Sequence, residues 1–565
     1  MPTPKTLNTA IEADRAAENA TVPSENCGHL FVLHCAAKGI AADAILTPTR
    51  DGQSVDAGTV KALTKEEMES NGFKGVTAVY EGQISTDSYT TEEEAVEGAM
   101  KVVASFISTA APALKGSSSG FRRAKPLIAL PMPGVGLVDV ADLIKDMENI
   151  VRPLISQLYA AANTYGVDVA ICTVDEGAFK VAQVLRERCC PFKGGPFWML
   201  PAHMHEEVVR LKKQAQAGRL GILYGAGVSF PSGLPSWGGL LKELAEDAGF
   251  NEEERAALAE LGFLDQPTII EDKMGDRAKF KQAVAACVKH GRYTPAHSIM
   301  GSMHLPAVTT NYDTLYEDAV ASAATNELER VQRLPWDASR LAQMPDGVRR
   351  VLKLHGCVRD PQSIVLTRED YMRYEDTRRA LRGLLHQNLL EREYLVLGFS
   401  MTDDNVHLII DQVRKTLERH HVDLKSFYMG TVVTLRENVM FRKLWSDDFR
   451  VVSCGKSWAD QPAWIHDIFL DAVASEIVVQ NAAASFILDE SYEALLSPAQ
   501  LKIKQALAPL QALANERDAA VVDSDEWGLL EQMLAKFGDA TAVAKATNAL
   551  PGAPTVHKAT TEVYS

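Results

Sequence analysis

The sequence lacks any pair of cysteines spaced to hold a metal ion. Its eight cysteines are scattered over 565 residues, and no two of them form a C-x-x-C pair. Disulfide frameworks are typical of short secreted domains, so this scatter favours reduced thiols and a cytoplasmic protein. A structural zinc site needs paired ligands of this kind, and we therefore expect no metal.

Long apolar runs and an excess of basic residues are missing as well. The most apolar segment, residues 126–138, contains three prolines and is shorter than the roughly 18 apolar residues of a membrane span. Lys and Arg number 58 against 74 Asp and Glu, which gives a net charge of −16. An acidic chain repels a phosphate backbone, so we expect neither a membrane protein nor a nucleic-acid binder.

The apolar pattern predicts an α/β fold in two successive stretches, residues 26–200 and 201–475. Short buried strands alternate with amphipathic helices in both, which indicates mostly parallel sheets with helices on either face. Within the first stretch, the Gly- and Ser-rich segment 116–123 predicts a flexible loop. The strands expected there are 29–34, 42–46, 126–131 and 167–172, with helices at 91–107 and 142–164; the second stretch opens with a helix at 206–216 and a strand at 220–224.

The remaining parts of the chain have less pattern. Residues 1–25 and 541–565 are expected to be tails, and 476–540 a helical region. Asp523 and Glu526 are spaced as a capping box for a helix in that region.

The segment 220–241 contains the first motif, in which a strand runs into two closely spaced glycines. Glycines permit a tight turn and let the backbone approach a pyrophosphate, and the helix expected next would place its N-terminus against the negative charge. Phe230 stands where the G-x-G-x-x-G fingerprint of dehydrogenases has its third glycine, so the segment departs from that fingerprint. The candidate ligand residues here are Gly225, Ala226, Gly227, Ser229, Gly233 and Trp237.

Three further strands are followed by residues that could take part in chemistry. Polar residues at the carboxyl ends of parallel strands face the ligand crevice of an open α/β sheet. Taken alone, Asn311 and Asp313 are better explained by a turn, and Asp403 is explained equally well by a helix N-cap. A lone histidine such as His355 is more often packed or exposed than catalytic. The candidates are Asn311 and Asp313 after strand 307–310, His355 after 351–354, and Gly398, Ser400 and Asp403 after 394–397.

In this order the four motifs resemble the sirtuin-like family, over residues 206–475. The resemblance implies a Rossmann-like sheet that binds NAD. Two features depart from the protein deacylases of that family: the zinc-ribbon cysteines are missing, and Ser236, Trp237 and Gly238 stand where Asp-Phe-Arg usually follows. The second and fourth motifs look like those of sirtuin-like effectors of bacterial antiphage systems, which are typically NAD hydrolases that deplete cellular NAD on infection.

The resemblance also implies a role for each candidate in cleaving the bond between nicotinamide and ribose. Asn311 would position the attacking water or a ribose hydroxyl, His355 would be the general base, and Asp313 would orient Asn311 or the nicotinamide amide. NAD is thus a substrate, and no metal takes part. The residues implied in binding it are Gly225, Ala226, Gly227 and Ser229 at the pyrophosphate, Gly233 and Trp237 in the same loop, and Gly398, Ser400 and Asp403 on the adenosine side.

The rest of the chain leaves alternatives open. Residues 26–200 resemble a macro domain, a fold that binds ADP-ribose, or form an α/β fold used for assembly or partner contact. An NAD hydrolase that is always active would kill its host, so we expect control by a homo-oligomer, by a sensor partner protein or by a nucleotide signal. Two alternative functions are a non-catalytic NAD- or ADP-ribose-binding regulatory module, and a sirtuin-type protein deacylase or ADP-ribosyl transferase.

Overall fold

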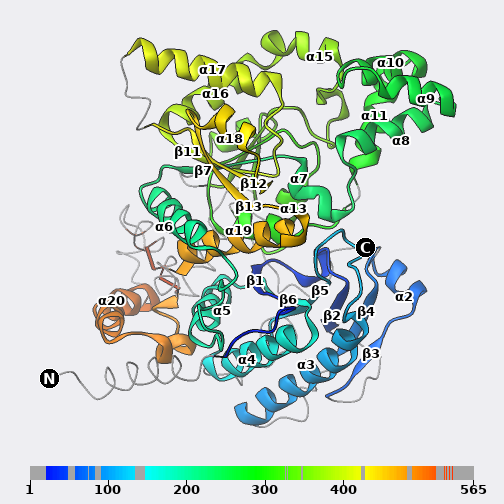
Figure 1. Ribbon diagram of the computed structural model, residues 1–565. Helices are drawn as coiled ribbons and strands as arrows, with labels where there is room; N and C mark the ends of the chain where they lie inside the picture. Colours follow the sequence, from blue (N-terminus) through cyan, green and yellow to red (C-terminus); the bar gives the residue numbers. More distant parts are fainter. Residues whose placement is uncertain are drawn as a thin grey trace.

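The computed structural model contains two β-sheets, one in each half of the chain, with helices between and around them (Figure 1). The first 20 residues, the predicted tail at 541–565, and the pair Asp523 and Glu526 lie outside the described residues. No helix in the part of the chain that the structure describes combines the length and the apolar character of a membrane span. The described residues are 21–48, 58–73, 75–82, 91–133, 147–289, 291–324, 326, 329–344, 348–420, 427–479, 486–516, 527, 530, 533–534 and 537–538.

The first sheet has six strands in the order β1-β6-β5-β2-β4-β3. Neighbouring strands run parallel, except that β3 pairs antiparallel with β4. Its central strands are buried on both faces, which explains their continuous apolar runs and confirms the predicted α/β class. The strands are β1 (Leu30–His34), β2 (Ala44–Pro48), β3 (Val60–Ala62), β4 (Ala78–Gly82), β5 (Leu127–Pro131) and β6 (Asp168–Thr173).

Side-chain caps begin several helices of this half. Thr91 exchanges hydrogen bonds with Glu94 in a capping box, and Asp175 accepts a hydrogen bond from the Ala178 N–H. The predicted helix at 91–107 runs on to residue 114, and the first five residues of the one predicted at 142–164 lie outside the described residues. The helices are α2 (Lys65–Ser70), α3 (Glu92–Leu114), α4 (Met147–Tyr165) and α5 (Glu176–Arg188).

The predicted loop at 116–123 is present, but it is anchored. The Asp43 carboxylate accepts a hydrogen bond from the Gly120 N–H (2.7 Å). At the end of the loop, the buried Arg123 guanidinium pairs with Asp168 (3.0 Å). Both partners lie far away in the sequence, so a composition that predicts flexibility does not reveal that the loop is held in place.

All neighbouring strands of the second sheet are parallel, in the order β13-β12-β11-β7-β8-β10-β9. The order places β7 between β8 and β11, so the chain leaves β7 first to one side and later to the other. Ligands bind at such a switch point in open α/β sheets, beyond the carboxyl ends of the strands. The strands are β7 (Leu220–Tyr224), β8 (Ala307–Thr309), β9 (Gln332–Leu334), β10 (Arg350–Lys353), β11 (Glu393–Leu397), β12 (Gly430–Arg436) and β13 (Phe449–Gly455).

The helix expected after the two glycines is present, and it is short. α7 (Ala226–Ser229) is a single turn, which passes into a 3-10 turn at Phe230–Ser232. Pro231 has no N–H to continue an α-helix, and Gly233 adopts a left-handed backbone (φ +86°) that ends the segment. One turn has little of the dipole of a long helix, so the helix N-terminus expected against the pyrophosphate is weak here.

A group of helices with its own hydrophobic core lies in the connection between β7 and β8 (Figure 1). Leu240, Leu244, Phe280 and Val284 are buried in this core. The helices of the second half are α6 (Ala202–Gln216), α8 (Trp237–Asp247), α9 (Glu252–Ala259), α10 (Asp265–Met274), α11 (Arg277–Val288), α12 (Pro295–Ser302), α13 (Leu315–Ala321), α14 (Ala338–Leu341), α15 (Arg368–Met372), α16 (Tyr374–Glu391), α17 (Asp404–Arg419), α18 (Val439–Trp445) and α19 (Pro462–Val479).

Sheets and helices alternate in layers. α3, α4 and α5 cover one face of the first sheet, and α16, α17 and α18 cover one face of the second. Between the sheets lie α6, α12, α13 and α19, where one hydrophobic cluster includes Phe31 from the first sheet and Ile222 from the second. The two halves therefore share a core, and their division into domains near residue 200 stays a prediction.

Charged side chains are buried where α19 packs against the first half. Asp471 of α19 accepts a hydrogen bond from Arg186 (2.5 Å), and its Oδ2 atom lies 2.7 Å from His29 Nε2. All three residues are 2% exposed or less. These contacts join the two halves through groups that are costly to bury alone.

A second contact between the halves precedes α12. Arg292 Nε donates a hydrogen bond to the carbonyl of Ile40 (2.9 Å), and the Ala41 N–H donates to the carbonyl of Tyr293 (2.8 Å). The chain from 292 to 293 is thereby bound to the loop that follows β1.

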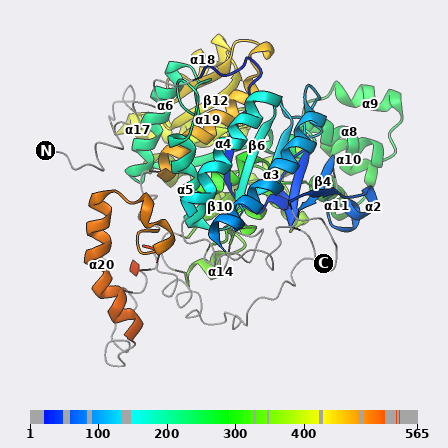
Figure 2. The same ribbon diagram turned by 90° about the horizontal axis from the view of Figure 1, so that it is seen from below.

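The C-terminal helix α20 (Pro498–Glu516) packs against the first half. Leu501, Leu507 and Leu510 contact the cluster on the α3 side of the first sheet, to which Trp527 also belongs. Seen from below, α20 lies on the opposite side of the molecule from α8, α9 and α10 (Figure 2).

Candidate active site

The four sequence motifs begin directly after one row of residues that crosses the second sheet. Strand register pairs Tyr224 with Leu397 on one side and with Thr309 on the other. Thr309 in turn pairs with Lys353. Because the strands are parallel, the residues that follow this row leave the sheet at the same edge. They are Gly225 and Gly398, one position past the row, and Asn311 and His355, two positions past it.

The glycine loops after β7 and β11 are in close contact with each other. The Gly225 N–H donates to the Leu397 carbonyl (3.0 Å), and the Gly227 N–H donates to the Gly398 carbonyl (2.9 Å). Gly398 has φ +55°, and a Cβ placed there would lie 2.5 Å from the Val228 nitrogen. The close contact between the loops thus requires glycine at position 398. It also uses the N–H groups of Gly225 and Gly227, so the assignment of this loop to a pyrophosphate stays a prediction.

Ser229, Asn311 and Asp313 form a buried hydrogen-bonded group. Ser229 Oγ donates to Asp313 Oδ2 (2.9 Å), and Asn311 Nδ2 donates to both of those oxygens (3.2 Å each). Asp313 Oδ1 accepts the Leu315 N–H (3.1 Å), so this residue also stabilises the turn after the strand, as the alternative explanation expects. The three side chains are 6% exposed or less. Asp313 therefore makes the hydrogen bond through which it could orient Asn311. The Ser229 hydroxyl is hydrogen-bonded to protein atoms.

His297 extends this group, although no sequence motif pointed to it. Its Nε2 atom lies 3.2 Å from Ser229 Oγ, and its Nδ1 atom accepts the Thr294 N–H (3.0 Å). Burial lowers the pKa of His297 to about 3, so the ring is neutral at physiological pH. Thr294, Pro295 and His297 are spaced as a helix start, which the sequence could have shown. The contact with a serine 68 positions earlier gives no local signal.

Lys353 places a buried positive charge next to the same turn. Its Nζ atom donates to the main-chain carbonyl of Asp313 and to Glu317 Oε1 (3.2 Å). Burial lowers the pKa of Lys353, but Glu317, Cys357 and Asp313 outweigh it, and the pKa lies above its usual value. A charged Lys353 therefore fixes the backbone between Asp313 and Glu317.

His355 Nε2 is a buried nitrogen that has no hydrogen-bond partner among the described residues. It lies 3.4 Å from Asp403 Oδ2, and the ring packs edge-on against Tyr371 and Tyr374. Burial lowers the pKa of His355 below its usual value, although Asp403 opposes this effect. A neutral imidazole with an unsatisfied nitrogen is what a general base requires.

Asp403 lies beside His355, whereas the sequence analysis assigned it to the adenosine side. Its Oδ1 atom accepts the Val406 N–H (3.0 Å) and caps α17, as the alternative explanation expects. Its Oδ2 atom accepts the Tyr371 hydroxyl (2.9 Å). Ser400 is exposed and hydrogen-bonded to a neighbouring threonine, so its contact with adenosine stays a prediction.

Two further buried polar atoms near the β7 loop lack a partner among the described residues, Ser232 Oγ and Trp237 Nε1. Gly233 lies between them, and a Cβ placed there would meet no atom within 4 Å. Unpaired buried donors are costly, and oxygen atoms of a bound ligand would satisfy them. Together with His355 Nε2 they suit a polar ligand such as NAD. Within the described ranges, no group of three His, Cys, Asp or Glu side chains could hold a metal.

Part of this region matches the model of a known protein family. Residues 306–447 match the model of the SIR2-like domain. This segment is similar to a SIR2-like domain. It contains Asn311, His355 and Gly398, whereas the glycine segment after β7 precedes it.

Curated proteins similar to this chain include two that are named NAD(+) hydrolases and one that is named a defence-associated sirtuin. An NAD(+) hydrolase ThsA from Enterococcus faecium is 28% identical over 228 residues, which are 38% of this chain and 44% of the relative. One from Bacillus cereus (strain MSX-D12) is 28% identical over 212 residues, 37% of this chain and 42% of the relative. The Defense-associated sirtuin 2 of Bacillus subtilis is 24% identical over 39% of this chain and 22% of its own length. The chain thus spans less than half the length of these relatives.

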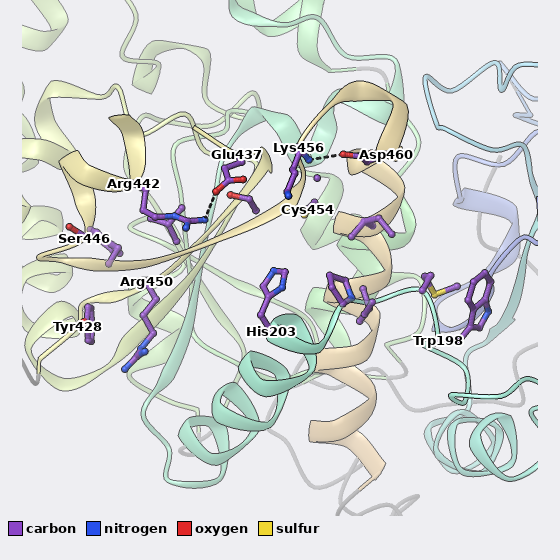
Figure 3. A pocket seen from close by; sticks show the side chains of 18 residues that line it. Trp198, His203, Tyr428, Glu437, Arg442, Ser446, Arg450, Cys454, Lys456 and Asp460 are labelled. Carbon is purple, nitrogen blue, oxygen red and sulfur yellow. Dashed lines mark hydrogen bonds and ion pairs between the residues drawn. The ribbon is translucent and has the colours of Figure 1, made fainter. Parts of the chain in front are cut away.

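A groove of about 1130 Å³ lies along the edge strand β13 (Figure 3). Trp198, His203, Tyr428 and Arg450 are among the residues that line it. None of the candidate residues at the carboxyl ends of the strands does so. The groove is therefore separate from the site described here.

Proposed function

We propose that the chain cleaves NAD between nicotinamide and ribose, releasing nicotinamide and ADP-ribose, and acts as a regulated effector that depletes NAD in antiphage defence. The observation that carries this proposal is the Nε2 atom of a neutral His355, which has no hydrogen-bond partner among the described residues and lies at the same sheet edge as the Asn311 amide. The SIR2-like match includes both residues, and the ThsA relatives are NAD(+) hydrolases by name.

Hydrolysis of this bond needs one proton acceptor and little acid catalysis. Nicotinamide leaves as a neutral molecule, because the electron pair of the broken bond returns to its positively charged ring. The ribose C1′ atom then has oxocarbenium-like character, and the oxygen of water forms a bond to it. His355 Nε2 takes the proton that this water loses, a role worth about two to four orders of magnitude in rate.

Asn311 and the loops around it would hold the substrate. The Asn311 amide donates its hydrogens to Ser229 and Asp313, so its Oδ1 atom is left to accept a hydrogen bond from water or a ribose hydroxyl. We assign the loop at 225–227 to the pyrophosphate, with Gly233 and Trp237 in the same binding segment. Gly398 and Ser400 are assigned to the adenosine side, and Asp403 to the neighbourhood of His355.

We further propose that this activity is held off until a signal arrives, through a homo-oligomer, a sensor partner protein or a nucleotide. Unrestrained NAD cleavage would kill the host cell. The first half of the chain shares a hydrophobic core with the catalytic half, which gives it the contacts needed to act on the site.

Nicotinamide release from NAD by the purified chain, with and without its neighbouring gene products, tests the function. We expect release by the wild type under at least one of these conditions, and none by His355→Ala or Asn311→Ala. His203→Ala, an exposed histidine in the separate groove, should keep full activity. Circular dichroism should show that all variants are folded. Bound NAD without release under every condition would favour a non-catalytic binding module instead.

A further inference from the structure

His297 lies at one end of the hydrogen-bonded group that holds Asn311, at a position that no motif assigns. We propose that His297 is a positioning residue for NAD cleavage, which fixes the orientation of the Asn311 amide through Ser229. The inference rests on the proposed function, because this orientation matters to a reaction only if NAD is cleaved beside Asn311.

The neighbours of His297 decide which of its ring nitrogens carries the proton. The Thr294 N–H can only donate, so Nδ1, which lies 3.0 Å from that nitrogen, holds a lone pair. The ring is fully buried, and none of its hydrogen bonds is to a carboxylate among the described residues. A neutral ring then has its proton on Nε2, which donates to Ser229 Oγ over 3.2 Å.

This donor sets the direction of the hydrogen bonds that follow. Ser229 Oγ accepts from His297 and from Asn311 Nδ2, so its single proton goes to Asp313 Oδ2. The Asn311 amide donates to the same carboxylate oxygen. Turning the amide over would place its Oδ1 atom against the Asp313 carboxylate and against Ser229 Oγ, which has no second proton to donate, and acceptors repel each other. The Asn311 Oδ1 atom therefore faces away from the group and has no partner among the described residues.

The helix that bears His297 is well suited to hold a ring in one place. All eight residues of α12 are buried, and the helix packs against α13, α19 and β1. Thr294 caps the helix, and His297 reaches back to it from the third helical position. A ring held from both sides in this way can restrict the Ser229 hydroxyl.

Two substitutions separate positioning from a merely structural role in the cap. Asn at position 297 can still accept the Thr294 N–H, but it is too short to reach Ser229. Gln at the same position can both accept that N–H, as in an ordinary capping box, and extend an amide hydrogen towards Ser229. The two variants therefore share the cap and differ in the contact with Ser229.

The test is steady-state NAD cleavage by the full chain, under the condition in which the wild type is active. We expect His297→Gln to keep most of kcat, and His297→Asn to lose about 10- to 100-fold in kcat with KM within about twofold of the wild type. Melting temperatures of the two variants should be alike. In a Ser229→Ala background, His297→Asn should cost nothing further, because the contact through which it acts is already gone.

Equal activity of the Asn and Gln variants, or a loss that appears in KM rather than kcat, would overturn the inference. A wild type that binds NAD and never releases nicotinamide would instead contradict the proposed function. The tautomer remains measurable in that case, through the ¹⁵N signals of labelled histidine. We expect a neutral His297 with its proton on Nε2. A proton on Nδ1 would refute the proposed hydrogen bond from His297 to Ser229, whatever the activity.

Discussion

The Oδ2 atom of Asp403 lies 3.4 Å from the Nε2 atom of His355, at the edge of the sheet where four strands end. The same oxygen accepts a hydrogen bond from Tyr371, and the other carboxylate oxygen caps α17. One side chain thus joins the start of a helix to the proposed general base, and its charge acts directly on the pKa of His355.

This contact predicts the pH dependence of the Asp403→Asn variant. A carboxylate beside a histidine favours the protonated ring, so removing it should lower the pKa of His355 further. Cleavage requires the neutral ring, and the acid limb of the kcat/KM profile should therefore move to lower pH. Asn remains a good N-cap, which keeps α17 in place. Asp404→Asn, one residue further on and exposed, should leave the limb where it is; an equal shift in both variants would contradict a direct effect.

Gly398→Ala should destabilise the protein and weaken NAD binding. The φ of +55° disfavours any Cβ, and that Cβ would lie 2.5 Å from the Val228 nitrogen, a main-chain atom that cannot rotate away. We expect a loss of about 2–4 kcal/mol in the free energy of unfolding, measured by chemical denaturation. Gly275→Ala is the control, because φ there is +67° and no atom lies within 4 Å of the added Cβ. Equal losses in the two variants would show that the contact between the loops does not matter.

The buried ring of His297 predicts a loss of stability in acid. Its pKa is about 3 in the folded protein, while an unfolded chain protonates histidine near pH 6.5. Between these two pH values His297 binds a proton in the unfolded state but not in the folded state, so the free energy of unfolding falls as the pH falls. The slope due to this group is about 1.4 kcal/mol per pH unit. His297→Gln, compared with the wild type by denaturation from pH 7 to pH 5, should show a shallower fall; parallel curves would contradict a buried neutral ring.

Arg186→Met should be strongly destabilising. The substitution leaves the buried Asp471 carboxylate with only His29, and breaking a buried pair in this way typically costs about 3–5 kcal/mol. Lys212→Met is the matched control, since its partner Glu476 also belongs to α19 but the pair is partly exposed. That change should cost less than about 1 kcal/mol. Urea denaturation measures both, and similar losses would mean that the buried charges do not hold the halves together.

The fold class and the four loops of the site could be predicted from the sequence, because both depend on local patterns. Continuous apolar runs mark strands that are buried on both faces, and a polar residue or glycine directly after such a run marks the carboxyl end of a strand. Asn311, His355 and Gly398 were proposed in this way, and the fold places them at one edge of the sheet. Their alignment across one row requires only that the four strands be neighbours in register.

Contacts between distant segments could not be predicted in the same way. His297 and Ser229 meet only because α12 and the β7 loop pack together, and a single sequence gives no signal of that packing. The sequence predicts a helix after the glycines but not its length, which Pro231 and Gly233 limit. Only the fold brings Asp403 to His355, and its expected place on the adenosine side stays a prediction.

Tyr293 and Thr294 are consecutive residues, and they belong to different sets of contacts. Tyr293 is bound through its carbonyl to Ala41 of the first half, whereas Thr294 holds the ring of His297. A single peptide unit therefore separates the first half of the chain from the hydrogen bonds around Asn311. The hydrogen-bonded path from the loop at 36–41 to the ring of His297 thus runs through two neighbouring residues and through no strand of either sheet.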